Sequence, residues 1–224
     1  MRLPIRLLVP VVLVAGPLLT GCGGSEPRPE AVPGAPAPAA KPSDATPSAA
    51  GSPDVPAAAA SLGGPGTACP LPVSFSLAKD WKPKAVELPA DPDPDLVDLV
   101  RQGPAVMRCE IDAKPAGHIG FLRVWTVEKG SAQPSARAAL EAFVKGDGTS
   151  SAVSYREGRA GALPAVEATY TVRSTLFDED KEERAFAVAT PRGVVVVDLG
   201  GSDTEEHRAM LPAYELARTS LKLG

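Results

Sequence analysis

Apolar and polar residues alternate along much of the second half of this 224-residue chain, and a period of two predicts β-strands. The clearest case is 165–176, where every second residue from Val166 to Val172 is apolar. The uninterrupted apolar run 194–197 predicts a central strand that is covered on both faces. Strands are expected, from these runs and the turn residues between them, at 73–77, 105–113, 118–129, 152–159, 165–176, 183–190 and 194–200.

Three segments show helical patterns instead. Segment 135–145 follows Pro134, which suits a first helical turn, and its apolar residues share one face. A helical turn is expected at 95–101. Ser202 and Glu205 form a capping-box pattern that opens a C-terminal helix, which Pro212 is expected to kink or split.

Strands joined by short turns pair antiparallel. The order of elements therefore predicts an α+β sandwich, a mostly antiparallel sheet of about six or seven strands with packed helices. This domain is expected to be single and to span 69–224.

The N-terminus has a different pattern. Arg2 and Arg6 precede the apolar run 7–19, which is shorter than the ~20 residues that span a bilayer and is typical of a secretory signal. The run ends in Leu19-Thr20-Gly21-Cys22, which resembles the lipobox of bacterial lipoproteins.

The lipobox resemblance implies a signal peptide at 1–21 and cleavage before Cys22. It also implies a diacylglyceryl group on Cys22, with acyl chains such as palmitate, as the membrane-lipid partner. Two acyl chains hold a protein stably on a membrane, so the expected location is the extracytoplasmic face of the cell membrane. The alternative is an uncleaved N-terminal helix with an incidental cysteine.

Residues 22–68 are expected to form a disordered tether after the lipidated cysteine, because Ala, Pro, Gly and Ser dominate and no aromatic residue occurs. The alternative use of such a Pro-rich stretch is as a ligand for an aromatic groove. Outside the cytoplasm the two remaining cysteines, Cys69 and Cys109, allow one pairing, and we predict that disulfide. A metal or redox pair is the alternative, but no C-x-x-C motif supports it.

The net charge is −4, from 23 Lys and Arg against 27 Asp and Glu. The charges are mixed and no basic block occurs, which argues against nucleic acid as a partner. No phosphate loop or dinucleotide fingerprint is present, so no cofactor is expected.

Few residues suggest chemistry. Asp91, Asp93 and Asp95 have the spacing that opens a calcium loop, but Leu96 and Gln102 replace the Gly and Glu that such a loop requires, so a solvated acidic turn is the alternative and no metal is expected.

Trp81 and Trp125 are candidates for a binding groove, or else core residues. His118 and His207 are the two histidines. A catalytic cluster of Glu110, Asp112, His118 and Glu167 would require the sheet to bring these side chains together.

The segment Phe75-Ser76-Leu77-Ala78-Lys79-Asp80-Trp81 resembles the strand and turn into Trp that open PsbP-like domains, although that family often has Pro where Ala78 stands. The helix end Thr219-Ser220-Leu221 and the order of elements are also similar. Actinobacterial lipoproteins of the LpqN type share this arrangement. The resemblance implies a non-enzymatic binding or assembly factor.

Two functions are therefore carried forward. The first is a tethered, non-catalytic binding or assembly module of the cell envelope, with an envelope protein or lipid as partner. The alternative is a secreted hydrolase that modifies the envelope.

Overall fold

The computed structural model of the chain describes residues 55–128, 134–174 and 178–224, all within one compact unit, Ala49–Gly224. The predicted signal peptide, Cys22 and the tether up to residue 54 lie outside the described residues. No helix within the described ranges is long and apolar enough to cross a bilayer.

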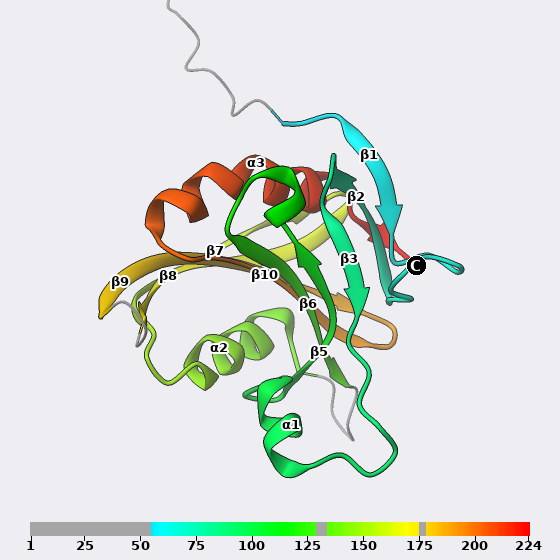
Figure 1. Ribbon diagram of the computed structural model, residues 1–224. Helices are drawn as coiled ribbons and strands as arrows, with labels where there is room; N and C mark the ends of the chain where they lie inside the picture. The colour runs from blue at the N-terminus through cyan, green and yellow to red at the C-terminus, as the bar shows by residue number, and fades with distance from the viewer. Residues whose placement is uncertain (1–54, 129–133, 175–177) are drawn as a thin grey trace, which may run out of the picture. The chain divides into compact units, whose positions relative to one another are not determined.

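Two antiparallel sheets form the framework (Figure 1). The large sheet has the order β3 (Lys82–Ala85), β5 (Ala105–Asp112), β6 (Gly120–Glu128), β10 (Gly193–Gly201), β9 (Glu179–Thr190), β8 (Leu163–Ser174) and β7 (Ser151–Ala160), with the short β4 (Arg101–Gln102) paired to β5. The small sheet has the order β1 (Ala58–Leu62), β2 (Val73–Ala78) and β11 (Lys222–Leu223).

Helices cover both faces of the large sheet. Helix α2 (Ala136–Gly146) packs on one face, and α3 (Thr204–Ser220) lies on the other, beside β2 of the small sheet (Figure 1). The short α1 (Pro94–Leu99) and the 3-10 turn η1 (Lys114–Ala116) lie in connections. The predicted α+β fold, with a mostly antiparallel sheet and packed helices, is confirmed.

Strand β10 separates two apolar cores. Val195 and Val197 point into the core beneath α3, while Val194 and Val196 point into the core beneath α2. All four are fully buried, and each fully buried aliphatic side chain of this size contributes roughly 1.5–3 kcal/mol. The prediction of a central strand covered on both faces is therefore confirmed.

Helix α2 begins one residue after the predicted start, and Pro134 precedes its N-cap instead of lying in the first turn. The Oγ of Ser135 accepts a hydrogen bond from the Ala138 N–H at 3.1 Å, which caps the helix. Its buried side is Ala139, Leu140, Phe143 and Val144.

Helix α3 differs from the prediction at its start. Its N-cap is Asp203, whose carboxylate accepts from the Glu206 N–H at 2.8 Å, so the cap lies one residue later than the predicted Ser202. The helix continues through Pro212. An interior proline costs about 3 kcal/mol, and the buried Met210, Ala213 and Tyr214 on either side outweigh that cost.

The folded domain begins before the predicted boundary at residue 69. Strand β1 pairs with β2 from Ala58↔Ala78 to Leu62↔Phe75. Backbone hydrogen bonds do not require large side chains, so an Ala-rich segment can pair, and Leu62 then anchors it in the core at 1% exposure. The tether prediction is wrong for residues 58–68.

The predicted disulfide between Cys69 and Cys109 is present, with the Cα atoms 5.9 Å apart. Cys69 lies in the connection between β1 and β2, and Cys109 lies in β5, so the bond joins the small sheet to the large one. For a closed loop of this length the chain-entropy model gives roughly 4 kcal/mol of stabilisation.

Candidate functional site

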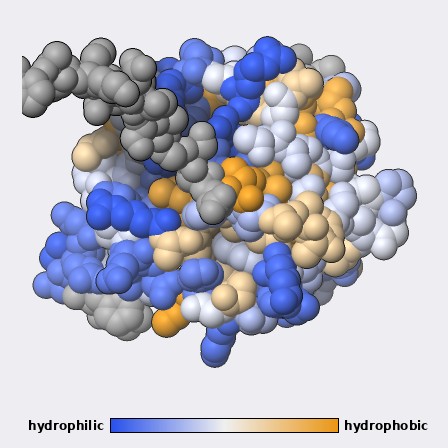
Figure 2. Space-filling model, turned by 90° about the horizontal axis from the view of Figure 1, so that it is seen from above, coloured by the Kyte–Doolittle hydropathy of each residue, from blue (hydrophilic) through white to orange (hydrophobic). Residues whose placement is uncertain are grey.

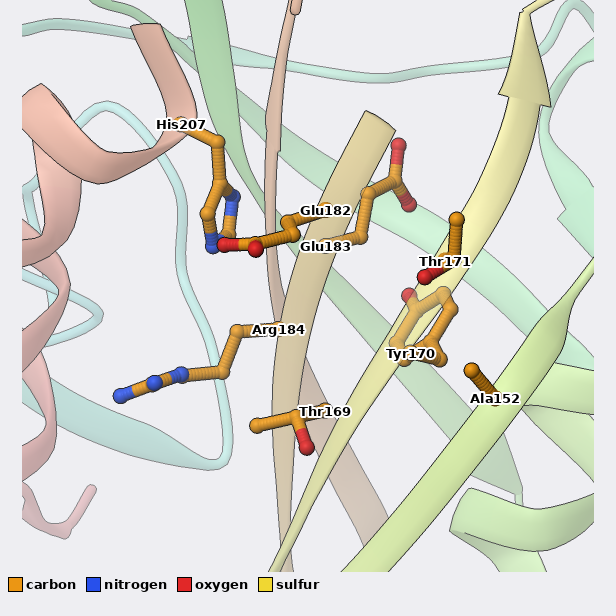
Figure 3. A pocket seen from close by; sticks show the side chains of 8 residues that line it. All are labelled: Ala152, Thr169, Tyr170, Thr171, Glu182, Glu183, Arg184 and His207. Carbon is orange, nitrogen blue, oxygen red and sulfur yellow. The ribbon is translucent and has the colours of Figure 1, made fainter. Parts of the chain in front are cut away.

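A polar pocket lies where the first turns of α3 pass over β8 and β9. We call it the α3 pocket, and its volume is about 190 Å³. It is shown in Figure 3. Its lining residues are Ala152, Thr169, Tyr170, Thr171, Glu182, Glu183, Arg184 and His207.

Strand register explains why these polar groups meet. Thr169 pairs with Arg184, and Thr171 pairs with Glu182. Because side chains on a strand alternate between faces, these four share the face on which Phe186 packs against α3. Figure 3 shows Glu182, Arg184 and His207 on one side of β9 and Glu183 pointing to the other.

His207 reaches the pocket from α3. Its backbone N–H donates to the Asp203 carbonyl at 3.0 Å, and the turn lies directly over Gly201. A Cβ at Gly201 would come within 2.6 Å of the His207 backbone nitrogen, so a side chain at 201 would displace this turn. Glycine at that position therefore fixes where the imidazole sits.

The imidazole of His207 is 2% exposed. Burial, and then the charge of Arg184, lower the pKa of His207 to about 4, while Glu182 and the Leu199 backbone act in the opposite direction. The ring is therefore neutral at pH 7, with one donor and one acceptor nitrogen. Its buried Nδ1 has no hydrogen-bond partner among the described residues.

Arg184 keeps unused hydrogen-bonding capacity. Its buried Nε has no partner within the described ranges. Its Nη1 lies 4.0 Å from the Glu167 Oε1 and 3.7 Å from the Glu215 Oε1, which is beyond hydrogen-bond distance. Both carboxylates accept hydrogen bonds from residues other than Arg184.

The closer partners of Glu167 and Glu215 come from β7 and α3. Glu167 accepts from the Tyr214 hydroxyl at 3.1 Å and from Arg156 at 2.8 Å. Glu215 accepts from Arg218 at 2.6 Å. Burial raises the pKa of Tyr214 well above its ordinary value, with the Glu167 charge adding to the effect. The Tyr214 hydroxyl therefore remains a donor.

The opposite face of β8 carries a buried pair that is hydrogen-bonded. The Tyr170 hydroxyl donates to Asp198 Oδ1 at 2.9 Å. Burial, followed by the charge of Glu183, raises the pKa of Asp198 to about 7. Glu183 itself pairs with Lys181 at 2.6 Å. This cluster supports the strands behind the α3 pocket.

The α3 pocket holds a histidine, carboxylates and threonine hydroxyls, but not in a catalytic arrangement. A nucleophile must lie within hydrogen-bond reach of its base. No described hydroxyl donates to His207, and an imidazole with a pKa near 4 is a poor base at neutral pH. The geometry supports binding better than acyl transfer.

Glu110, Asp112, His118 and Glu167, the four residues considered under the hydrolase alternative, do not come together. Glu110 pairs with Arg123 at 2.9 Å, and Asp112 accepts from the Lys114 backbone N–H. His118 lies beside Glu206, with Nδ1 and Oε2 3.3 Å apart. Glu167 faces α3, whereas the alternation of β5 and β6 places Glu110 and Arg123 on the other face of the sheet.

The acidic segment before α1 forms a helix cap. Asp93 accepts from the Asp95 N–H at 2.9 Å, and Asp91, Asp93 and Asp95 are all exposed. No cluster of three potential metal ligands occurs among the described residues. The structure places these aspartates in the solvated turn that was the alternative interpretation.

Both tryptophans lie in the cores. Trp125 is 4% exposed and packs edge-on against Phe143, with the ring centroids 5.3 Å apart. Trp81 is 7% exposed and lines a depression of about 240 Å³ with Pro56 and Met210. Figure 2, which looks down on the face of α3 and β1, shows apolar residues in the middle of a largely hydrophilic surface. A binding role for Trp81 stays a prediction.

Thr169, Thr171, Glu182 and Arg184 were not among the residues predicted from the sequence to form a site. The alternation along 165–176 predicts a strand, but it does not show what covers the face that carries the threonines. The signal available was the Thr-x-Thr spacing, because the paired strand is charged at every position from 179 to 184 and shows no alternation there. Only the packing of helices on both faces of the large sheet shows that these polar residues lie beneath α3.

The sequence matches the model of a protein family, Lipoprotein_23, described as "uncharacterised lipoprotein", over residues 39–221. No curated protein matches the chain. Among solved structures it is similar to the solution structure of cyanobacterial PsbP (CyanoP) from Synechocystis sp. PCC 6803. The identity is 14%, the coverage is 73% of this chain and 97% of that chain, and the TM-score is 0.47.

Proposed function

Because this chain belongs to the family of uncharacterised lipoproteins matched over residues 39–221, we propose that it is anchored through Cys22 at the extracytoplasmic face of the cell membrane. There it holds a non-catalytic binding domain in the cell envelope. The proposed partner of this domain is an envelope molecule, and the anchor is the diacylglyceryl group.

Two observations support the location. The chain begins with a charged, then apolar, segment that ends in the lipobox-like Leu19-Thr20-Gly21-Cys22. The domain also contains a disulfide between buried cysteines, and disulfides persist in oxidising compartments outside the cytoplasm.

One observation carries the binding function. The α3 pocket contains buried polar atoms of two side chains, Arg184 and His207, that have no partner among the described residues. A buried polar group without a hydrogen bond costs roughly 1–3 kcal/mol. A bound partner that satisfies these atoms recovers that cost, so the pocket favours occupancy.

The anchor is tested by Cys22→Ser. Membrane and soluble fractions of cells are compared for the wild type and the variant. The wild type is expected in the membrane fraction, and the variant in the soluble or secreted fraction. A variant as firmly bound to membranes as the wild type would refute the lipid anchor.

The binding role is tested by crosslinking in cells that express the native lipoprotein, followed by mass spectrometry. The expected result is reproducible enrichment of an envelope component relative to Arg184→Met and an unfolded control. Arg137→Met, on α2, is the matched control that should retain the enrichment. Enrichment no greater than that of the unfolded control would refute a binding role.

A secreted hydrolase is the second candidate, because the α3 pocket brings His207, Glu182 and two threonine hydroxyls together. Purified wild type and His207→Gln are incubated with isolated envelopes, and released fragments are measured by mass spectrometry. Products released by the wild type and absent with His207→Gln would favour this candidate over the binding module.

A further inference from the structure

We propose that the α3 pocket binds a neutral, hydroxyl-rich group, the ring of a sugar or cyclic polyol. This proposal rests on the proposed binding function and specifies its ligand class. It follows from three properties of the pocket, which are its hydrogen-bonding groups, its charge and its size.

The free hydrogen-bonding groups are of mixed kind. Arg184 Nε–H is a donor, and the neutral His207 ring leaves its Nδ1 without a partner among the described residues, while the Leu199 backbone already bonds to the ring. The hydroxyls of Thr169 and Thr171, two residues apart on β8, can each donate and accept, and neither has a partner among the described side chains. A ligand hydroxyl can donate one hydrogen bond and accept another at the same time, so it can pair with both kinds of group in this lining.

The charges disfavour an ionic ligand. On the side of β9 that faces His207, one carboxylate, Glu182, stands against one guanidinium, Arg184, so the lining has no excess charge that would select an ion. Both carboxylates of the lining already have cationic partners, Arg208 for Glu182 and Lys181 for Glu183. A cation therefore finds no free carboxylate.

The size limits the ligand to one ring. The volume of about 190 Å³ lies below the roughly 300–1,000 Å³ of pockets that hold drug-sized molecules. The remainder of a larger saccharide or glycolipid would extend into solvent, because the pocket opens beside β7, whose residues at this end are exposed.

The test uses the intact lipoprotein in a detergent without a sugar headgroup. Saturation-transfer NMR and thermal unfolding are measured with glucose, mannose, galactose, arabinose, N-acetylglucosamine and inositol at millimolar concentration. Inorganic phosphate and choline are the ionic probes. At least one sugar or inositol is expected to bind and to raise the unfolding temperature, and the ionic probes are expected to do neither.

Two variants test where the ligand binds. Thr169→Val and Arg184→Met each remove one hydrogen-bonding group and should weaken binding about five- to tenfold. Arg137→Met on α2 should bind like the wild type. Near-wild-type far-UV circular dichroism of each variant shows that it is folded.

Several results would overturn the ligand class. These are binding of phosphate or choline in place of every sugar and inositol, binding by none of the probes, and sugar binding that both pocket variants retain. Continued crosslinking to an envelope component under any of these outcomes would leave the binding function standing. If the sugar probes do not bind and the crosslinking to an envelope component is also absent, the proposed binding function is refuted as well.

Discussion

The two faces of the large sheet each bury a titratable side chain, Asp198 on the α2 face and His207 on the α3 face. The two side chains differ in whether their buried polar atoms are hydrogen-bonded. On the α2 face, Asp198 accepts a hydrogen bond from Tyr170 at 2.9 Å. On the α3 face, His207 Nδ1 and Arg184 Nε have no partner within the described ranges. Buried polar groups in native proteins are nearly all hydrogen-bonded. The Tyr170–Asp198 pair therefore stabilises the fold. The His207 and Arg184 side chains line a pocket that a ligand can enter, whereas the Nε1 of Trp125, which also has no partner in the described part of the chain, lies in the core beneath α2.

The largest expected loss of stability comes from truncating a side chain in the apolar core beneath α2. Phe143→Ala removes a fully buried ring that packs against Trp125, and such truncations cost about 3–5 kcal/mol. Urea unfolding should show this loss, while Leu99→Ala, at a residue 72% exposed, should change stability by less than about 0.5 kcal/mol. A loss below about 1 kcal/mol for Phe143→Ala would show that the α2 face is not tightly packed.

The pH dependence of stability separates the two buried groups. The pKa of His207 is lowered from 6.5 to about 4, so between these values the unfolded chain binds more protons and stability falls as pH falls. The pKa of Asp198 is raised from 3.8 to about 7, so between these values the folded chain binds more protons and stability rises as pH falls. In the wild type the two effects oppose each other.

Substituting each group separates the two contributions. Each contribution changes the free energy of unfolding by at most about 3–4 kcal/mol. Relative to the wild type, His207→Gln should gain stability on going from about pH 6.5 to pH 4. Over the same interval Asp198→Asn should lose it. Urea unfolding across this pH range measures the difference in stability between each variant and the wild type. The contributions of the other carboxylates are common to both proteins and cancel in this difference. Parallel profiles for the two variants would contradict the assigned protonation states.

Tyr170→Phe should have the smallest effect of the three. It leaves Asp198 without its hydroxyl donor at no loss of ring packing, and the expected cost is about 1–3 kcal/mol. Tyr155→Phe is the matched control, because its ring stacks under Arg137 at 4.4 Å on the edge strand, and it should be close to neutral. Equal effects of the two changes would mean that the Tyr170–Asp198 bond adds no stability.

Much of the framework could be predicted from the sequence because its signals are local. Alternation, an apolar run and the turn residues between them located seven strands of the large and small sheets, and the apolar spacing after Pro134 located α2. Two cysteines outside the lipobox-like motif allowed one pairing, which the structure contains. The anchor at Cys22 stays a prediction, since it lies outside the described residues.

The candidate site could not be predicted in the same way. Thr169 and Arg184 are 15 positions apart by their numbers and meet because β8 and β9 pair in one register. His207 joins them because α3 crosses over Gly201. Strand β1 could not be predicted for the same reason, because backbone pairing with β2 orders residues whose composition is typical of a linker.

The sequence by itself determined the element types, the pairing of Cys69 with Cys109 and the α+β class, because periodicity and residue chemistry act over a few neighbouring positions. Only the tertiary structure decided which polar residues of β8 and β9 are covered by α3, and which of them lack a partner. Burial and hydrogen-bond satisfaction depend on atoms that arrive from distant parts of the chain, so the pocket exists only once the helix has packed on the sheet.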